Sequence, residues 1–226
     1  MSTIPSTSPH PSAAELMDEQ YRYQRYIYDW SRKYYLFGRD ALLNEIQLER
    51  QDTLLEIGCG TGRNLIKLHK RYPHNALYGV DASRLMLEQA NHKLSHHPHS
   101  YQVILKQGLA QDLTLKYLHR TQGFDHIVFS YVLSMIPEWQ TAFNQALLLL
   151  KPNGTVHLVD FADQSALPSL AQQGLKHWLN WFNVHPDPTV PTYLSTLAQT
   201  PTSTLKQRFL LGRYAFIAHY TPRNTL

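Results

Sequence analysis

The chain has 226 residues, of which 43% are hydrophobic, and this is enough to bury the core of one α/β domain. Its formal charge of +4 is spread along the sequence, which argues against a nucleic-acid partner but is compatible with an anionic membrane surface. Cys59 is the single cysteine, so no internal disulfide can form, and we expect a reducing, cytoplasmic setting without a spanning segment or a leader.

The N-terminal part divides into two segments. Residues 1–14 are polar and rich in proline, which predicts a disordered tail. The pattern of residues 15–48 predicts a helical lid, and the pattern of residues 49–226 predicts the catalytic core of the same domain. We therefore expect a single domain over residues 15–226.

Two rows of side chains run along the predicted helical lid at the spacing of helix turns. An apolar row, which should pack on the domain, consists of Tyr23, Ile27, Trp30, Tyr34 and Phe37. The other row alternates hydroxyl-bearing rings with guanidinium groups and consists of Tyr21, Arg25, Tyr28, Arg32 and Tyr35. Arginine pairs well with carboxylates and the rings supply apolar or cation–π walls, so the second row suits an anionic head group. The alternative is an amphipathic lid whose arginines are only solvated.

From residue 53 onward, strand and helix patterns alternate, which predicts a doubly wound parallel sheet with its ligand at the carboxyl ends of the strands. The predicted elements are strand 53–58, helix 63–71, strand 76–81, helix 83–94, strand 102–107, strand 125–132, helix 139–150, a turn at 151–154 and strand 155–161. An amphipathic helix around 171–182 and a shorter one after Pro191 should follow. Strands 205–210 and 214–220 should then close the sheet as an antiparallel hairpin.

The most informative motif is the glycine-rich turn after the first predicted strand. Gly58, Gly60 and Gly62 alternate with other residues, and Glu56 precedes them at the end of an apolar run. Glycine lets a backbone approach a nucleotide-like ligand, because it lacks a Cβ and tolerates positive φ. Asp81 ends the second predicted strand, where a carboxylate can hold a ribose diol.

This block resembles the first motif of class I S-adenosylmethionine-dependent methyltransferases. The resemblance implies a seven-stranded Rossmann-like sheet, in which Glu56 and the glycines line the methionine part, Asp81 holds the ribose and Met86 packs on adenine. Leu109 stands where the family has an aspartate that contacts adenine, so the backbone of Ala110 or the side chain of Gln111 or Asp112 should replace it. The full cofactor-binding set that we expect is Glu56, Gly58, Cys59, Gly60, Gly62, Asn64, Asp81, Ala82, Met86, Ala110, Gln111 and Ser130.

The end of the fourth predicted strand should lie beside the reacting centre in this family. Ser130 and Tyr131 are therefore expected to contact the ligand, and the end of the fifth strand at Asp160 is a second expected wall. A histidine cluster at 96–99 lies in a proline-containing loop, and we expect it to bind no metal. Cys59 is interpreted as a small packing residue and not as a nucleophile.

Several blocks also resemble the diacylglycerylhomoserine N-methyltransferases of betaine-lipid synthesis. The similar blocks are residues 18–29, 32–40, 58–64, 130–139 and 159–164. The resemblance implies that three methyl groups pass to the homoserine amine of a glycerolipid, at a membrane surface to which the protein binds peripherally. It also implies, as a candidate partner, the 3-amino-3-carboxypropyl transferase that makes this lipid.

The roles of the remaining candidate residues follow from that chemistry. Tyr131, Tyr21 and Tyr28 are the expected catalytic residues, which would accept or orient the proton of the amine. The expected ligands of the substrate carboxylate are Arg25, Arg32 and Tyr35. Two alternatives remain: methylation of another amphipathic small molecule, such as a quinone precursor, and a non-catalytic module that binds S-adenosylmethionine or lipid.

Overall fold

The computed structural model describes residues 36–98, 100–168, 172–175, 177, 179, 186–200 and 203–222. The predicted tail and the predicted helical lid as far as residue 35 lie outside the described residues. Only parts of the predicted helix around residues 171–182 lie within them.

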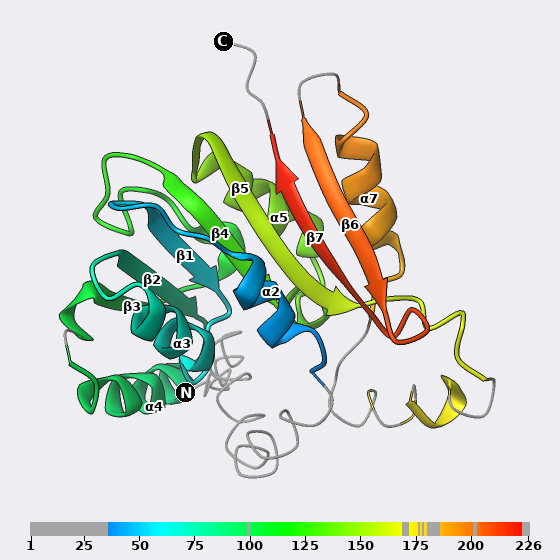
Figure 1. Ribbon diagram of the computed structural model, residues 1–226, viewed down its shortest axis with the longest axis horizontal. Coiled ribbons are helices and arrows are strands. Elements are labelled where there is room, and N and C mark those ends of the chain that lie inside the picture. Colours follow the sequence, from blue (N-terminus) through cyan, green and yellow to red (C-terminus); the bar gives the residue numbers. More distant parts are fainter. Residues whose placement is uncertain are drawn as a thin grey trace, which may run out of the picture.

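A seven-stranded sheet forms the centre of the fold, in the order β3-β2-β1-β4-β5-β7-β6 (Figure 1). Strands β1 to β5 are parallel, whereas β7 is antiparallel to both β5 and β6. This arrangement confirms the doubly wound sheet and its closing hairpin. The strand bounds are β1 Thr53–Ile57, β2 Ala76–Asp81, β3 Val103–Gln107, β4 Phe124–Ser130, β5 Leu150–Phe161, β6 Thr204–Leu210 and β7 Ala215–Thr221.

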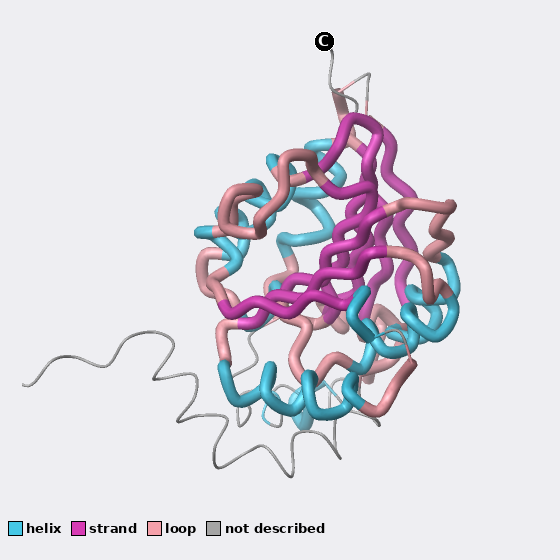
Figure 2. Tube along the Cα trace, turned by 90° about the vertical axis from the view of Figure 1, so that its left-hand side faces the viewer, coloured by secondary structure: helices cyan, strands magenta, loops and turns pink. Residues whose placement is uncertain are grey.

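Helices cover both faces of the sheet, as the side view in Figure 2 shows. Within the described residues, no helix has the length and apolar character needed to cross a membrane. The helix bounds are α2 Arg39–Glu45, α3 Arg63–Arg71, α4 Arg84–Ser95, α5 Trp139–Leu148 and α7 Thr189–Leu197. Three short 3-10 helices join them, namely η1 Ser100–Gln102, η2 Ala110–Asp112 and η3 Leu133–Met135.

The hydrophobic core lies in two layers, one on each face of the sheet. Leu42 of α2, Leu65 of α3 and Leu87 of α4 pack on one face. Phe143 of α5 and Leu194 of α7 pack on the other. Neighbouring residues of β1 enter opposite layers, which explains why the parallel strands have nearly continuous apolar sequences.

Two predicted boundaries were wrong, each for a local reason. The helix expected to run through Gly38 begins only after it, because Gly38 has φ +86° and a Cβ there would lie 2.5 Å from Leu210 Cδ1. The turn expected at residues 151–154 lies within β5 as an irregularity in its pairing with β4. A Cβ at Gly154 would lie only 2.9 Å from the carbonyl oxygen of Phe124, so glycine fits best at this position.

Candidate functional site

The glycine-rich turn connects β1 to α3 at the carboxyl edge of the parallel strands. Gly58, Gly60 and Gly62 have φ values of +69°, +54° and +74°, a region that residues with a Cβ rarely adopt. The Gly58 amide donates to the Val80 carbonyl at 2.8 Å, which ties the turn to β2. A Cβ on Gly58 would lie 2.3 Å from Val132 Cγ2, so the backbone passes this side chain as only glycine allows.

Asp81 joins the end of β2 to the glycine turn. Its Oδ2 accepts a hydrogen bond from the Gly60 amide at 2.7 Å, and its Oδ1 accepts one from the Ser83 amide at 2.9 Å. Ser83 also caps α4, because its side chain accepts from the Met86 amide. The sequence thus places this carboxylate at the carboxyl edge of the sheet, where a ribose is expected to bind.

An open pocket with a cavity volume of about 160 Å³ adjoins this turn. Its walls come from the ends of β1, β2 and β3 and from the segment that follows β4. The lining residues are Ile57, Gly58, Asp81, Ala82, Gly108, Leu109, Ala110, Gln111, Val132, Met135, Ile136 and Pro137.

Glu56 lies directly beneath the turn and is 1% exposed. Its Oε1 accepts a hydrogen bond from Asn64 Nδ2 at 2.7 Å, while its Oε2 has no hydrogen-bond partner among the described residues. Asn64 in turn accepts from Arg39 of α2 at 3.3 Å. Burial raises the pKa of Glu56 from 4.5 to about 7, although Asn64 and Arg39 favour the ionised form. A buried oxygen without a partner suits a cationic amino group, such as that of methionine.

We expect Glu56→Gln to lower the affinity for S-adenosylmethionine more than tenfold at pH 8, because a charge-assisted hydrogen bond contributes about 1.5–3 kcal/mol. Because Glu56 has a pKa of about 7, wild-type affinity should rise between pH 6 and 8, and the variant should lose this dependence. Calorimetric titration across this range measures both effects. An unchanged affinity at pH 8 would contradict the assignment.

The same variant separates binding from stability. The folded protein keeps the Glu56 proton up to about pH 7, whereas the unfolded chain releases it near 4.5, so stability is lost as the pH rises through this window. This shift in the pKa of Glu56 lowers the free energy of unfolding by on the order of 3 kcal/mol at pH 8. Glu56→Gln should therefore unfold at no lower urea concentration than wild type at pH 8, even though it binds less tightly.

Five of the twelve predicted cofactor residues line the pocket, namely Gly58, Asp81, Ala82, Ala110 and Gln111. The other seven are buried and do not line it, namely Glu56, Cys59, Gly60, Gly62, Asn64, Met86 of α4 and Ser130 at the end of β4. Burial raises the pKa of the Cys59 thiol well above its usual value, in keeping with its interpretation as a packing residue.

Taken together, these features fit S-adenosylmethionine. Glu56 would hold the amino group, Asp81 the ribose and the Leu109–Gln111 segment the adenine. The individual contacts of these residues stay predictions.

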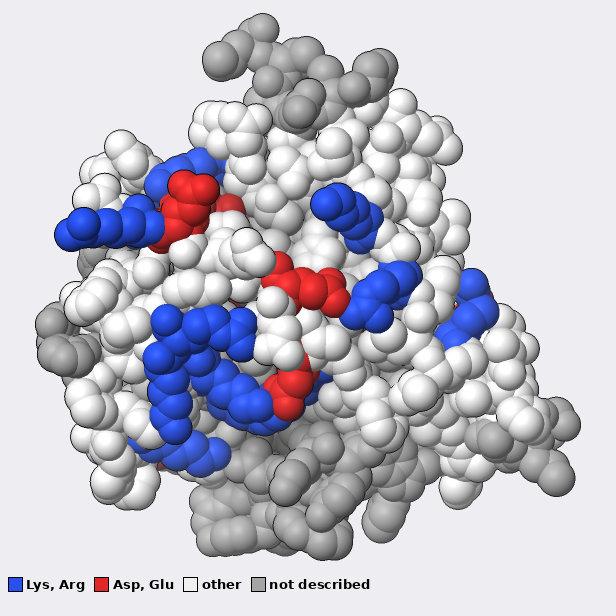
Figure 3. Space-filling view, viewed as in Figure 1, with Lys and Arg blue, Asp and Glu red and all other residues white. Residues whose placement is uncertain are grey.

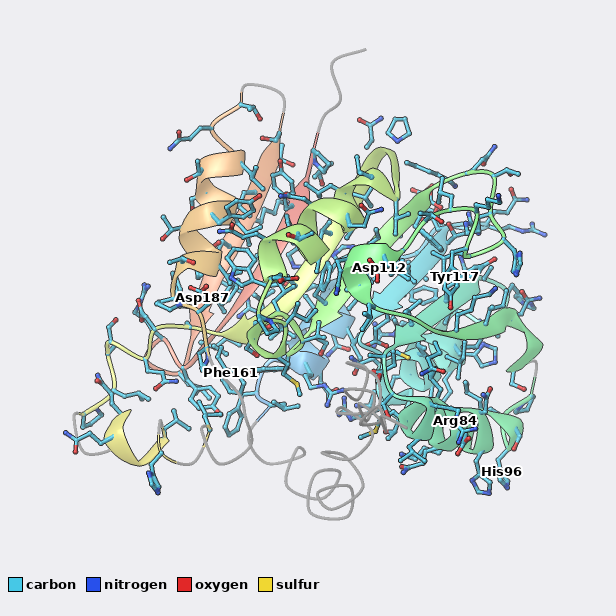
Figure 4. All side chains as sticks on the ribbon, turned by 180° about the vertical axis from the view of Figure 1, so that it is seen from behind. Arg84, His96, Asp112, Tyr117, Phe161 and Asp187 are labelled. Carbon is cyan, nitrogen blue, oxygen red and sulfur yellow. The ribbon has the colours of Figure 1, made fainter. Side chains whose placement is uncertain are left out.

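Tyr131 begins the segment after β4 and has an unusual backbone, with φ +57°. Its side chain is buried against Phe161, and its hydroxyl donates to the Phe37 carbonyl. Figure 4 shows Phe161 at the lower end of β5, the edge at which the parallel strands end. Burial raises the pKa of Tyr131 well above its usual value, so the hydroxyl keeps its proton at neutral pH. Its catalytic role stays a prediction.

Asp160 stabilises the segment that forms one wall of the pocket. Its carboxylate is 2% exposed and accepts hydrogen bonds from the amides of Ser134 and Phe161, at 3.2 and 2.8 Å. Burial raises the pKa of Asp160 to about 6. These bonds fix η3, whose Met135 lines the pocket.

Several predicted residues fall outside the described part of the chain. Among the catalytic candidates these are Tyr21 and Tyr28, and among the substrate ligands they are Arg25, Arg32 and Tyr35. His99 of the histidine cluster also lies outside it. Within the described residues, no group of three or more His, Cys, Asp or Glu side chains could hold a metal ion.

Sequence reasoning missed much of the apolar wall, namely Val132, Met135, Ile136 and Pro137. The block 130–139 was singled out, but only its first two residues were chosen. The positive φ of Tyr131 and the tight turn of η3 direct later side chains to the pocket, and neither feature is visible in a strand pattern. The Ile136-Pro137 pair was a usable signal for an extended segment here, because proline restricts the residue before it to extended conformations.

Comparison with known proteins agrees with this geometry. Residues 55–156 match the family model described as a methyltransferase domain. The demethylmenaquinone methyltransferase of Lactobacillus johnsonii is 27% identical over 123 residues, which cover 54% of this chain and 49% of that protein. The trans-aconitate 2-methyltransferase of Escherichia coli is 28% identical over 135 residues, which cover 57% of this chain and 49% of that protein. The chain thus matches about half the length of these curated relatives.

The crystal structure of the plantazolicin methyltransferase BpumL with SAH has the same fold. Its TM-score is 0.67 at 14% identity, and the match covers 92% of this chain and 93% of that chain. Residues 55–156 thus match a methyltransferase domain, and the chain shares the Rossmann-like fold of this solved methyltransferase.

Proposed function

We propose that this methyltransferase domain transfers three methyl groups from S-adenosylmethionine to the homoserine amine of diacylglycerylhomoserine, giving a betaine lipid. One observation carries the proposal: blocks that resemble the betaine-lipid enzymes come together at the carboxyl edge of the sheet. The block 58–64 forms the glycine turn, and the block 130–139 supplies Val132, Met135, Ile136 and Pro137 to the pocket.

A second resembling block supports the same wall. Residues 159–164 include Asp160, which fixes η3, and Phe161, which packs on Tyr131. Both blocks therefore lie at the carboxyl ends of β4 and β5, where the methyl acceptor is expected. The apolar character of this wall suits a lipid-linked acceptor better than a highly charged metabolite.

The chemistry depends mainly on positioning. When bound, S-adenosylmethionine supplies a methyl group on a positively charged sulfur that departs as a neutral thioether. The chain must hold an unprotonated amine in line with that methyl group and exclude water from it. Val132 and Met135 would exclude water, and the tyrosines of the predicted lid would orient the amine.

The substrate carboxylate is proposed to bind Arg25 and Arg32. Arg25→Ala or Arg32→Ala should reduce lipid turnover at least tenfold, since a charge-assisted hydrogen bond contributes about 1.5–3 kcal/mol. The affinity for S-adenosylmethionine should stay within about twofold. Steady-state turnover with calorimetry of cofactor binding measures both quantities.

Arg22→Ala is the matched control, because Arg22 belongs to neither row of the predicted lid. It should leave turnover unchanged. Full turnover in both test variants, or a loss of cofactor affinity equal to the loss of turnover, would show that this segment is only a structural cover.

The proposed substrate requires contact with a membrane surface. The predicted contacts are the aromatic segment 21–37 together with Trp178, Trp181 and Phe182. Figure 3 shows Lys and Arg side chains gathered on the face that carries α3, whose sequence contains Arg63, Lys67, Lys70 and Arg71. Each cation near an anionic surface contributes about 1 kcal/mol, so we expect sedimentation with anionic vesicles at low salt and release at high salt.

Charge variants test the contribution of α3. Lys70→Glu should weaken vesicle binding, whereas Lys116→Glu, an exposed change between β3 and β4, should not. Absence of co-sedimentation at low salt would contradict membrane association. It would leave the methyl transfer itself to be tested with detergent-dispersed lipid.

A quinone precursor is the second candidate acceptor, and the similarity to a demethylmenaquinone methyltransferase favours it. This acceptor would be methylated on a ring carbon and carries no carboxylate. Incubation with labelled S-adenosylmethionine and a membrane lipid extract tests both proposals together. Label in a zwitterionic lipid supports the first, and label in a quinone supports the second.

A further inference from the structure

Three histidines on neighbouring strands form a continuous hydrogen-bonded chain on one face of the sheet. His126 of β4 lies with its Nδ1 2.9 Å from Nε2 of His157 on β5. Nδ1 of His157 lies 2.7 Å from Nδ1 of His219 on β7. The strands β4, β5 and β7 are direct neighbours in the sheet (Figure 1). The three rings therefore follow one another across it.

Each end of this histidine chain meets a carboxylate. Nε2 of His126 lies 3.3 Å from Oδ2 of Asp52, just before β1. Nε2 of His219 lies 2.8 Å from Oε2 of Glu45, the last residue of α2. Burial tends to raise the pKa of Glu45, but hydrogen bonds from Arg208 and His219 hold it below its usual value. Glu45 is therefore ionised at neutral pH and acts only as an acceptor.

Counting protons shows that three neutral imidazoles cannot satisfy these contacts. A neutral imidazole carries one N–H and one lone pair. His126 and His219 use their single protons to donate outward to the carboxylates. His157 then has one proton for two neighbours that both present lone pairs. In one of its two contacts, two unprotonated ring nitrogens would then face each other at less than 3 Å, with their lone pairs repelling.

We propose that the histidine chain binds one excess proton, carried by His219, and that this proton fastens the end of α2 to the sheet. All four contacts are then donor–acceptor pairs. His219 donates to both Glu45 and His157, His157 donates to His126, and His126 donates to Asp52.

Two observations place the charge on His219. Burial, together with the neighbouring His126 and His219, lowers the pKa of His157 well below its usual value, so the central ring stays neutral. Of the two outer histidines, His219 has the closer carboxylate, at 2.8 Å against 3.3 Å. Coulomb attraction increases as this distance shortens, which favours the end at Glu45 although Arg208 also pairs with that carboxylate.

The charged surroundings permit this uptake. Glu45 also pairs with Arg208 of β6, and Asp125 of β4 pairs with Lys151 at 2.8 Å, so these cations are already neutralised. Lys206 of β6 faces the same side and is exposed. An open polar pocket beside the chain gives the proton a path to solvent, lined by Glu45, Thr155, His157, Thr204, Lys206, His219 and Thr221.

The arrangement does not suit a metal ion. The ring nitrogens face one another in pairs, and they do not converge on a common point. A tetrahedral site needs at least three donors directed at one position about 2 Å away.

The excess proton links pH to the attachment of α2. Glu45 ends this helix, whereas Arg39 at its beginning reaches Asn64 beneath the glycine turn. The folded protein binds the extra proton at pH values where the unfolded chain holds less of it. Stability from this source is therefore present at low pH and is lost as the pH rises.

Nitrogen-15 NMR of the histidine rings in the whole protein tests the proposal directly. At pH 7, His219 should show two protonated nitrogens, and His126 and His157 should show one each. Three neutral rings with ordered chain contacts would overturn the proposal. A perturbation of all three rings by one equivalent of Zn²⁺ would also overturn it, in favour of a metal site.

Urea unfolding between pH 6 and 8.5 provides the second test. The comparison is between wild type, His219→Gln and the control His74→Gln, whose histidine is exposed between α3 and β2. Wild type and the control should lose stability with pH more steeply than His219→Gln, by up to tenfold per pH unit in the unfolding equilibrium constant. Identical slopes in all three would contradict the proposal. If His219→Gln does not fold, the NMR result decides.

Discussion

Gly58→Ala is expected to reduce the affinity for S-adenosylmethionine more than tenfold and to destabilise the fold. The new Cβ would lie 2.3 Å from Val132 Cγ2 and 2.8 Å from Val132 Cβ, at a residue whose φ is +69°. Valine is stiff, so this clash moves the backbone of the turn or the wall of the pocket. Backbone strain and overpacking each cost about 1–3 kcal/mol. Calorimetry and thermal unfolding measure the two effects.

Gly174→Ala is the matched control, because a Cβ at Gly174 meets no atom within 4 Å. It should leave cofactor affinity unchanged. The double variant Gly58→Ala with Val132→Ala should recover part of the lost affinity, since it removes the closest contact. Wild-type affinity in Gly58→Ala would mean that the backbone of this turn does not approach the cofactor.

Asp81→Ala should also weaken S-adenosylmethionine binding more than tenfold. The carboxylate lines the pocket and holds the amides of Gly60 and Ser83, at 2.7 and 2.9 Å. Its removal loses hydrogen bonds to a charged acceptor, which contribute about 1.5–3 kcal/mol each. The measurement is calorimetric titration at fixed pH and salt.

Two further variants separate the causes of this loss. Asp81→Asn keeps the size of the side chain and one acceptor oxygen, so it should bind more tightly than Asp81→Ala and less tightly than wild type. Glu88→Ala removes an exposed carboxylate from α4 and should bind like wild type. Preferential binding of a nicotinamide dinucleotide by the unaltered protein would contradict the assignment of Asp81.

Much of the fold could be predicted, because each element carries its own periodic signal. The helix at 63–71 and the strand at 76–81 have the predicted bounds, and Ser83 caps the next helix. The errors at Gly38 and at residues 151–154 share a cause. Each depends on contacts with a distant strand, namely Leu210 of β6 and Phe124 of β4, which local sequence does not reveal.

The part of the site formed by the glycine turn could be predicted from the sequence, whereas the apolar wall formed by side chains after β4 could not. Glu56, the glycines and Asp81 follow from a strand–turn–helix pattern. The wall formed by Val132 and Met135 depends on the unusual backbone of Tyr131. The histidine chain was not foreseen, since its contacts join residues 31 and 62 positions apart and depend on strand register.

The most direct test of the proposed function is methyl transfer to a defined acceptor. The purified protein is incubated with methyl-labelled S-adenosylmethionine and diacylglycerylhomoserine in mixed vesicles, and the lipids are analysed by mass spectrometry. Parallel reactions contain a demethylated menaquinone or trans-aconitate. We predict stepwise addition of three methyl groups to the homoserine nitrogen and no labelling of the other acceptors. Label in either alternative acceptor, with none in the lipid, would contradict the proposal.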